Sequence, residues 1–311
     1  GVEYDFSKPF FQQWKELLSR TPLANLGNDN CVGSPFGNHN EDCKFCYLLY
    51  ASFNNERVHY SYGAVGLKDC IDVYVGGNLE LSYNDTLCTG LYKTHFSYDS
   101  DESISSFFLK SCKNLQDCIG CVNLRHKNNC IFNIQVSKEE YQNFIKNFKS
   151  NSFNEIEKYR KEAKDFWLIN PVKEYYGNSL NINVSGDYIY ESKNTKNGFM
   201  ITSAENCKYV NNLSAPSTKW CFDYTNWGHN SELLYECQSV SSGAYNSRFS
   251  MFCYPQPMNL EYCIYAISGC EDLFGCVGLK KKKYCILNKQ YTKEEYEELI
   301  SKIITNMNTN P

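Results

Sequence analysis

The sequence predicts a mainly β fold: a right-handed parallel β-helix, or solenoid, that is internally duplicated and carries amphipathic capping helices. The segment Cys121–Tyr141 recurs as Cys276–Tyr296, with 12 of 21 positions identical at a constant offset of 155 residues in a chain of 311. In the stretches between the predicted helices, roughly 31–136 and 177–290, short strand-like runs recur every ~11–12 residues. Even spacing of short strands is typical of a sandwich, a propeller or a solenoid, and the features of the individual segments favour the solenoid.

The chain opens with an amphipathic helix and a linker, predicted over residues 1–30. Apolar side chains recur there at helical spacing, and the Thr21-Pro22 pair ends the helix. The members of this apolar stripe are Phe10, Phe11, Trp14, Leu17 and Leu18. An amphipathic helix docks on an apolar surface, so we expect this helix to cover one exposed end of a strand stack.

The two halves of the solenoid are predicted over residues 31–136 and 171–290. Their repeated unit is one strand plus a turn, because Asn-Gly and Asp-Gly hairpin turns are nearly absent. Pairs of Asn or Asp followed by Cys recur at these steps, as expected for a small residue stacked at equivalent positions of successive coils. These pairs are Asp42-Cys43, Asp69-Cys70, Asp117-Cys118, Asn129-Cys130 and Asn206-Cys207. Two steps would complete a coil of ~22–24 residues.

Two further helical segments are predicted, a connector over residues 137–170 and a C-terminal capping helix over residues 291–311. Each begins with a capping box, in which a hydroxyl residue is followed three positions later by a glutamate. The two boxes are Ser137-x-x-Glu140 and Thr292-x-x-Glu295. Apolar residues at helical spacing follow both boxes, so these helices are also expected to cover the ends of the strand stacks.

Charge and hydropathy exclude two classes of partner. The net charge is −4, which gives no electrostatic reason to expect nucleic acid. No stretch approaches the ~18 consecutive apolar residues that would span a membrane. The partner is therefore expected to be a protein or a carbohydrate bound along a solenoid face, and an oligomer is compatible with the sequence.

The chain contains 17 cysteines, so at least one thiol cannot pair within it. Neighbouring coils would bring cysteines close enough for disulfides, for example Cys112 with Cys130 or Cys270 with Cys285. The odd count and the absence of a leader segment instead favour a ladder of reduced thiols. That interpretation favours a cytoplasmic over a secreted protein.

Two segments resemble a known family. They are Tyr4–Leu17 and Phe274–Tyr296, the second containing the motif Asn288-Lys289-Gln290-Tyr291. The family consists of uncharacterised cysteine-rich repeat proteins of small-genome environmental bacteria, which look like β-helix-like stacks and often carry zinc-ribbon-like segments. The resemblance covers nearly the whole chain and implies no known activity. This chain departs from the family in lacking paired Cys-x-x-Cys knuckles at zinc-ribbon spacing.

A zinc site is one hypothesis for the cysteines. Two pairs have Cys-x-x-Cys spacing, Cys43 with Cys46 and Cys118 with Cys121. Two thiolates can grip a tetrahedral zinc ion if two more ligands join them, and His39 and His59 would complete the first site. The alternative is that these cysteines are small residues of the inner wall. In an alternating strand, positions three apart face opposite sides, so one cysteine of each pair would point outward. No cofactor is expected, and zinc is the one possibility that the cysteine and histidine spacing leaves open.

Carboxylates provide a second hypothesis. Enzymes of the β-helix type that cleave polysaccharides use clustered carboxylates and basic residues on one outer face, and paired carboxylates perform acid–base chemistry at a glycosidic bond. The closest groupings are Asp69 with Asp72, and Asp223 with His229 and Glu232. The alternative is that these residues are solvated or bind backbone amides in turns.

An aromatic run provides the third hypothesis, a binding surface. Four aromatic residues fall within eleven positions: Trp220, Phe222, Tyr224 and Trp227. Alternation would place Trp220, Phe222 and Tyr224 on one face, where exposed rings could stack on sugars or seat a partner.

Together these observations predict a non-catalytic binding or assembly protein that presents an extended surface to a protein or glycan. A polysaccharide lyase or hydrolase of the β-helix type and a zinc-binding thiol protein are the alternatives.

Overall fold

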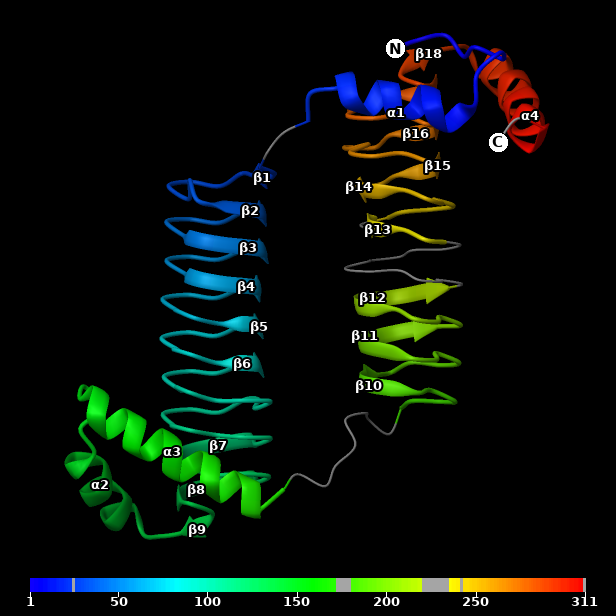
Figure 1. Cartoon of the computed structure of the whole chain (residues 1–311). Coiled ribbons are helices and arrows are strands. Elements are labelled where there is room, and N and C mark those ends of the chain that lie inside the picture. Colours follow the sequence, from blue (N-terminus) through cyan, green and yellow to red (C-terminus); the bar gives the residue numbers. More distant parts are fainter. Residues whose placement is uncertain (24–25, 172–179, 220–234, 241–242, 310–311) are drawn as a thin grey trace. The chain divides into compact units, whose positions relative to one another are not determined.

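The computed structural model describes residues 1–23, 26–171, 180–219, 235–240 and 243–309 (Figure 1). The chain divides into two compact units. The central unit is Ala24–Lys173, and the terminal unit combines Gly1–Leu23 with Glu174–Pro311.

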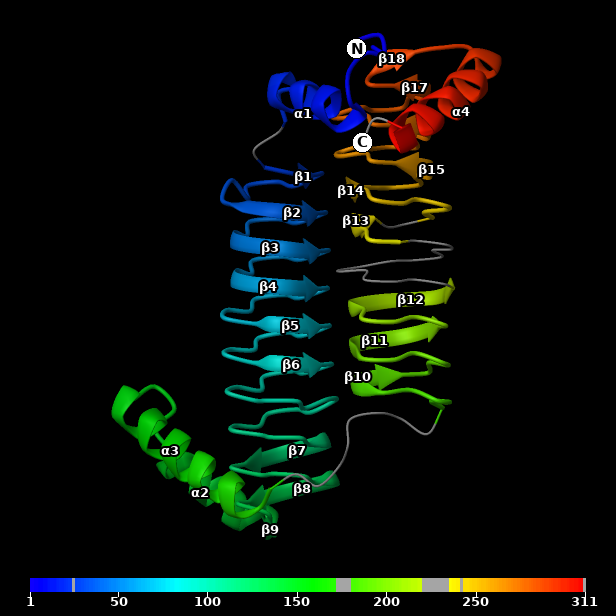
Figure 2. The ribbon, with the colours of Figure 1, turned by 45° about the vertical axis from the view of Figure 1, so that its right-hand side comes forward.

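The central unit begins with a six-stranded parallel sheet whose strands follow one another in chain order (Figure 2). The strands are β1 (Asn28–Asp29), β2 (Gly37–Glu41), β3 (Tyr47–Phe53), β4 (His59–Val65), β5 (Tyr74–Gly77) and β6 (Thr86–Thr89). Each residue pairs with the residue 12 positions later, as in Tyr50 with Tyr62 and Tyr62 with Tyr74. We call one such interval a step. Isolated parallel bridges continue the same register from Val32 to Val122.

The central unit ends in a second sheet and two helices. Strands β7 (Lys113–Ile119) and β8 (Arg125–Ile131) are parallel, and β9 (Ile134–Gln135) pairs antiparallel with β8. Helices α2 (Lys138–Asn147) and α3 (Phe153–Ile169) follow. Their apolar faces, including Tyr141, Ile156 and Ala163, form one buried cluster with Phe148 at the C-cap of α2, with Ile119 of β7 and with Phe108.

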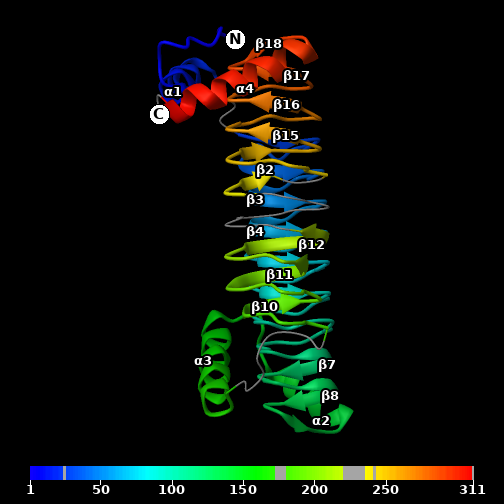
Figure 3. The same cartoon turned by 90° about the vertical axis from the view of Figure 1, so that its right-hand side faces the viewer.

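The terminal unit contains the first and last helices and three small sheets (Figure 3). The helices are α1 (Phe10–Arg20) and α4 (Lys293–Thr309). The first sheet comprises β10 (Gly186–Tyr190), β11 (Gly198–Glu205) and β12 (Asn211–Lys219). The second comprises β13 (Gln238–Val240) and β14 (Met251–Cys253), and the third comprises β15 (Met258–Glu261), β16 (Glu271–Phe274), β17 (Lys283–Ile286) and β18 (Lys289–Gln290).

Helix α1 packs on the strand region nearest the end of the terminal unit, as its apolar stripe predicts. Phe10 and Leu17 are buried in a cluster with Phe274 and Ile303. The indole Nε1 of Trp14 donates a hydrogen bond of 2.8 Å to the backbone carbonyl of Tyr262. The helix therefore joins the N-terminal segment to the C-terminal strands.

The backbone of the central unit repeats every three residues. Every third residue from His39 to Asn129 has a positive φ, and every third residue from Cys43 to Cys121 is buried. The left-handed conformation disfavours most L-residues, whereas Asn and Asp adopt it more readily because their short polar side chains bond locally. Many of these positions are accordingly Asn or Asp, including Asn54, Asp69 and Asn78.

This period of three explains the cysteines of the central unit. Both members of each Cys-x-x-Cys pair are buried, so the expectation that one cysteine of each pair points outward is wrong. That expectation assumed alternating strands, whereas a left-handed residue at every third position turns side chains three apart to the same interior. Inward thiols and hydroxyls make the same local bond: Cys70 Sγ donates to the Lys68 carbonyl (3.2 Å), as Ser100 Oγ does to the Tyr98 carbonyl (2.9 Å). The cysteines thus serve as small interior donors.

The predicted right-handed parallel β-helix is wrong. The described residues form a mixed α/β structure in which the strands are divided among five separate sheets, the largest being the parallel sheet β1–β6, and they close no solenoid. The predicted spacing of the steps matches the observed register, but the inferred coil of two steps does not. Two steps do not form one repeating unit, because each strand pairs with the strand one step later.

The duplicated segment has the same local structure in both copies. Cys130 pairs antiparallel with Gln135 in one copy, and Cys285 pairs with Gln290 in the other. Both predicted capping boxes are confirmed, with Glu140 and Glu295 each bonded to the preceding cap residue. No helix in the described part of the chain is long and apolar enough to cross a bilayer.

Candidate binding site

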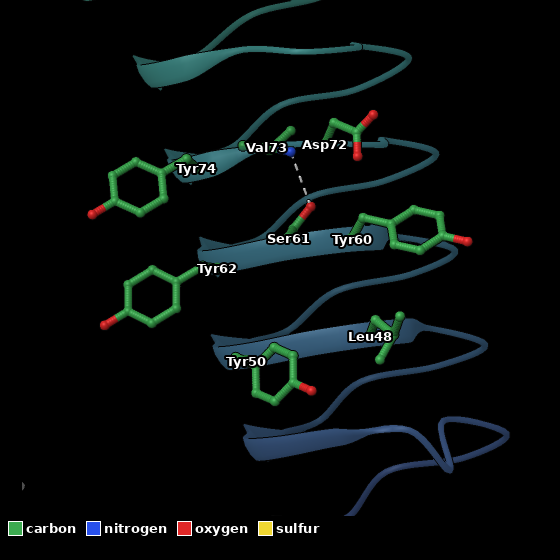
Figure 4. A pocket seen from close by; sticks show the side chains of 8 residues that line it. All are labelled: Leu48, Tyr50, Tyr60, Ser61, Tyr62, Asp72, Val73 and Tyr74. Carbon is green, nitrogen blue, oxygen red and sulfur yellow. Dashed lines mark hydrogen bonds between the residues drawn. The ribbon is translucent and has the colours of Figure 1, made fainter.

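A shallow groove of about 480 Å³ lies on the central unit across strands β3, β4 and β5 (Figure 4). Its lining combines four tyrosines with one aspartate and three smaller residues. These residues are Leu48, Tyr50, Tyr60, Ser61, Tyr62, Asp72, Val73 and Tyr74.

One flank of the groove is a tyrosine column, defined here as Tyr50, Tyr62 and Tyr74. The parallel register places these three residues on successive strands, each one step from the next. The rings of Tyr62 and Tyr74 lie side by side with nearly parallel planes, their centroids 5.6 Å apart and the interplanar angle 15°. All three side chains are exposed, so their alignment presents phenol groups along the outside of the sheet.

The opposite flank consists of Leu48, Tyr60 and Asp72, which also lie one step apart. Each has a left-handed backbone, with φ of 49°, 55° and 57° respectively. The floor between the flanks is formed by the inward residues Ser61 and Val73. The Ser61 hydroxyl of β4 accepts a hydrogen bond of 3.1 Å from the backbone N–H of Val73, the residue before β5 (Figure 4).

Asp72 is the only charged residue that lines the groove. Among the described residues, no cation forms an ion pair with it. The neighbouring Asp69 differs, because Arg57 Nε and Nη2 donate to its two carboxylate oxygens at 2.5 and 2.9 Å. That guanidinium lowers the pKa of Asp69. The groove therefore carries one uncompensated negative charge.

More aromatic side chains extend the groove at one edge. The ring of Tyr60 contacts that of Tyr47 with centroids 5.5 Å apart, and Tyr47 contacts Phe36 at the same distance. Both contacts are edge-to-face, and Phe36 is 58% exposed. The surface beside the groove is therefore also rich in exposed aromatic area.

The structure places the predicted carboxylates on different surfaces. Asp72 lines the groove, whereas Asp69 does not line it and is held by Arg57. Asp223, His229 and Glu232 lie outside the described residues. The predicted aromatic binding surface of Trp220, Phe222, Tyr224 and Trp227 also lies outside them.

The four predicted zinc ligands do not converge. Cys43 and Cys46 are interior, whereas the His59 ring lies against the outer aromatic side chains of Tyr47 and Tyr60. In the described ranges, no three His, Cys, Asp or Glu side chains are placed to hold a metal ion. A hydrogen bond between the two thiols lowers the pKa of Cys46 to about 7 and, together with burial, raises the pKa of Cys43. Burial lowers the pKa of His39.

No disulfide joins the cysteines that the structure describes. The suggested pair Cys112 and Cys130 does not match the register, in which Cys118 is the partner of Cys130. Cys118 and Cys121 instead share a hydrogen bond that lowers the pKa of Cys118 and, with burial, raises that of Cys121. The cysteine thiols therefore pack against one another in the interior of the central unit.

The tyrosine column is absent from the predicted site residues, although the sequence carries a signal for it. Tyr50, Tyr62 and Tyr74 recur at the spacing of one step, and Tyr98 continues the series after Thr86. The strand centres recur at the same interval, so tyrosines repeated at that spacing indicate a column on adjacent strands.

Comparison with known proteins does not assign the chain to a family. No family model matches the sequence, and no curated protein matches it. One solved structure with some similarity is that of a protein provisionally described as an acetyltransferase, from Desulfovibrio desulfuricans G20. The two chains are 11% identical, the comparison covers 83% of this chain and 67% of that one, and the TM-score is 0.15. At this TM-score the likeness carries no argument about fold or function.

Proposed function

We propose that the chain is a non-catalytic binding protein that holds an extended partner molecule in the tyrosine groove. The observation that carries the proposal is the alignment of Tyr50, Tyr62 and Tyr74 on successive strands beside the unpaired carboxylate of Asp72. Tyrosines supply large contact areas at interfaces and keep a hydroxyl for hydrogen bonding. A row of them along parallel strands suits a partner that runs across several steps.

The groove lacks the second carboxylate that glycoside hydrolysis requires. Asp72 is the only carboxylate in its lining, and Asp69 is occupied by the Arg57 guanidinium. A polysaccharide-cleaving enzyme at this site is therefore less well supported than a binding protein. The zinc-binding alternative has no converging ligand set in the described residues.

The test is binding of the purified full-length chain to arrays of peptides and of polysaccharides. Tyr62→Ala should weaken binding of any captured ligand about tenfold or more, as expected for an aromatic residue at the centre of an interface. Tyr98→Ala is the matched control, because Tyr98 is exposed at an equivalent register position but does not line the groove. Equal losses in the two variants, or substrate turnover that depends on Asp72, would contradict the proposal.

A further inference from the structure

We infer that the groove binds a proline-rich peptide segment in the polyproline II conformation, with an arginine or lysine of that segment facing Asp72. This inference rests on the proposed function and names its ligand class. Aromatic-lined grooves recognise this conformation in several peptide-binding domains, because the peptide is already extended and loses little entropy on binding.

The spacing of the groove matches the repeat of such a peptide. Neighbouring strands lie ~4.8 Å apart, so Tyr50 and Tyr74, two steps apart, are separated by about 9.6 Å along the stack. A polyproline II helix completes one turn in three residues with a rise of ~3.1 Å each, or about 9.3 Å per turn. Peptide residues three apart would therefore meet equivalent positions two steps apart, with only a small mismatch per turn.

The orientation of the rings is compatible with a proline-rich peptide. The planes of the Tyr62 and Tyr74 rings are within 15° of each other and their centroids are 5.6 Å apart, and Figure 4 shows the two rings side by side with open faces. Proline side chains of a bound peptide can pack on these open faces, as they do in other aromatic-lined grooves, and the hydroxyls beside the faces remain exposed. The backbone of a polyproline II peptide has unpaired carbonyls, which accept hydrogen bonds from phenol hydroxyls.

The hydroxyls needed for this are available. In the part of the chain that the structure describes, the phenol oxygens of Tyr60, Tyr62 and Tyr74 make no hydrogen bond to protein groups. Tyr60 and Tyr74 are 53% and 52% exposed, so a bound chain can reach both flanks of the groove. Donors on both sides of a shallow groove suit a ligand whose carbonyls point in several directions around its axis.

The negative charge of Asp72 favours a basic residue in the peptide. Asp72 is half-buried in the groove wall and lacks an ion-pair partner among the described residues. An arginine from the peptide can engage a carboxylate through two parallel hydrogen bonds, and such bonds are stronger than those between neutral groups. The same carboxylate disfavours acidic polysaccharides and phosphorylated ligands.

The test uses fluorescein-labelled dodecapeptides and fluorescence anisotropy with the full-length protein. The first set has proline at two of every three positions and one arginine, placed in turn at each remaining position. The second set replaces the arginine with glutamate, and the third replaces every proline with glycine, which removes the polyproline II preference. A neutral glucan oligosaccharide and a chitin oligosaccharide serve as competitors.

We expect at least one arginine peptide to bind saturably. The matching glutamate and glycine peptides should bind with an affinity about tenfold or more lower than that of the arginine peptide. Tyr62→Ala should reduce that affinity about tenfold or more. Asp72→Asn should abolish the preference for arginine over glutamate while keeping the left-handed backbone, which asparagine tolerates. Tyr98→Ala should leave the affinity within about twofold, and circular dichroism should show all three variants folded.

Two negative results are distinguishable. If a neutral oligosaccharide binds in a Tyr62-dependent manner and no peptide does, the groove is a binding site but the inferred ligand class is wrong. If neither the peptides nor the oligosaccharides bind, both the ligand class and the proposed function are overturned. An arginine preference that survives Asp72→Asn would overturn the assignment of Asp72 as the charge-selecting residue.

Discussion

Asp85 provides a stringent test of how the interior of the central unit works. Its side chain is fully buried, at 0% exposure, and occupies one of the inward positions of the three-residue repeat. Oδ1 accepts a hydrogen bond of 2.8 Å from the Ser97 backbone N–H, whereas Oδ2 has no hydrogen-bond partner in the described residues. Burial raises the pKa of Asp85 well above its ordinary value. We therefore expect the folded protein to hold this carboxyl in its protonated form.

Asn55 occupies an inward position equivalent to that of Asp85 and shows which hydrogen bonds an asparagine forms there. Its Nδ2 donates to the carbonyl of Ala64 and its Oδ1 accepts from the N–H of Leu67, one step later, both at 2.8 Å. Asp85 already makes the second of these bonds, to Ser97. Asp85→Asn should add the first, to the carbonyl of Thr94. In the variant, both polar atoms of the side-chain amide would form hydrogen bonds, whereas the native protein must hold the Asp85 carboxyl in its protonated form.

The magnitude follows from the proton balance. The folded state binds one proton at Asp85 that the unfolded state releases above its pKa of about 3.9, so raising the pH favours unfolding. The stability is fully present below pH ~3.9 and then falls by about 1.4 kcal/mol per pH unit until the pH passes the raised folded-state pKa. At pH 7 the loss can therefore reach about 4 kcal/mol. Asp85→Asn removes this loss and gains a hydrogen bond of about 1 kcal/mol.

The assay is urea unfolding of the native protein and Asp85→Asn from pH 4.5 to 8, followed by circular dichroism. The difference in unfolding free energy between the two proteins cancels titrations that they share, and it should grow by about 1.4 kcal/mol per pH unit from the acid end. The reciprocal variant Asn55→Asp should acquire the same pH dependence. A difference between the native protein and Asp85→Asn that does not change with pH would refute a protonated Asp85.

Three further predictions concern the interior and one helix cap. Cys88→Ser should lower the unfolding free energy by less than about 1.5 kcal/mol, because Ser100 fills the equivalent inward position one step later. Cys88→Leu should lower it by about 1–3 kcal/mol, because the larger side chain overpacks the interior. If urea unfolding ranks the two variants the other way, Cys88 does not serve as a small interior donor. Iodoacetamide on the native protein should label Cys31 before the other described cysteines, because Cys31 alone among them is not buried; peptide mass spectrometry would show this, and earlier labelling of a buried cysteine would reveal an opening of the stack. Ser137→Ala should lower stability by about 1 kcal/mol through loss of the capping box, and hydrogen exchange at the start of α2 that stays unchanged would argue against it.

The sequence predicted local features of this chain better than its architecture. The helix stripe of Phe10 and Leu17, the two capping boxes and the spacing of the steps all agree with the structure. These features depend on interactions within a few residues or on a simple interval. The facing of the paired cysteines was predicted wrongly because the backbone conformation was taken as alternating. No propensity rule predicts that Leu48 or Val75, which are poorly suited to a positive φ, will adopt it.

The candidate site was missed for a related reason. The three tyrosines of the column are far from contiguous, and only the register of one step brings Tyr50, Tyr62 and Tyr74 onto adjacent strands. The local aromatic cluster near Trp220 is the more conspicuous signal in the sequence. Asp72 was identified as a candidate, but its environment came from the structure, since the pairing of Asp69 with Arg57 distinguishes two otherwise similar carboxylates.

The fixed register has a consequence for how the length of such a chain can change. In the central unit, removal or insertion of one whole step leaves every inward and outward position aligned with its neighbours. Insertion of a single residue there would move inward side chains to outward positions, and outward side chains inward, until the three-residue repeat is again in register. The terminal unit shows how an extra residue is accommodated, because Gln238 pairs with Met251 and Met258 with Glu271, each a spacing one residue longer than a step. Single-residue insertions should therefore be tolerated where the register already holds an extra residue, whereas elsewhere only changes by whole steps should preserve the tyrosine column.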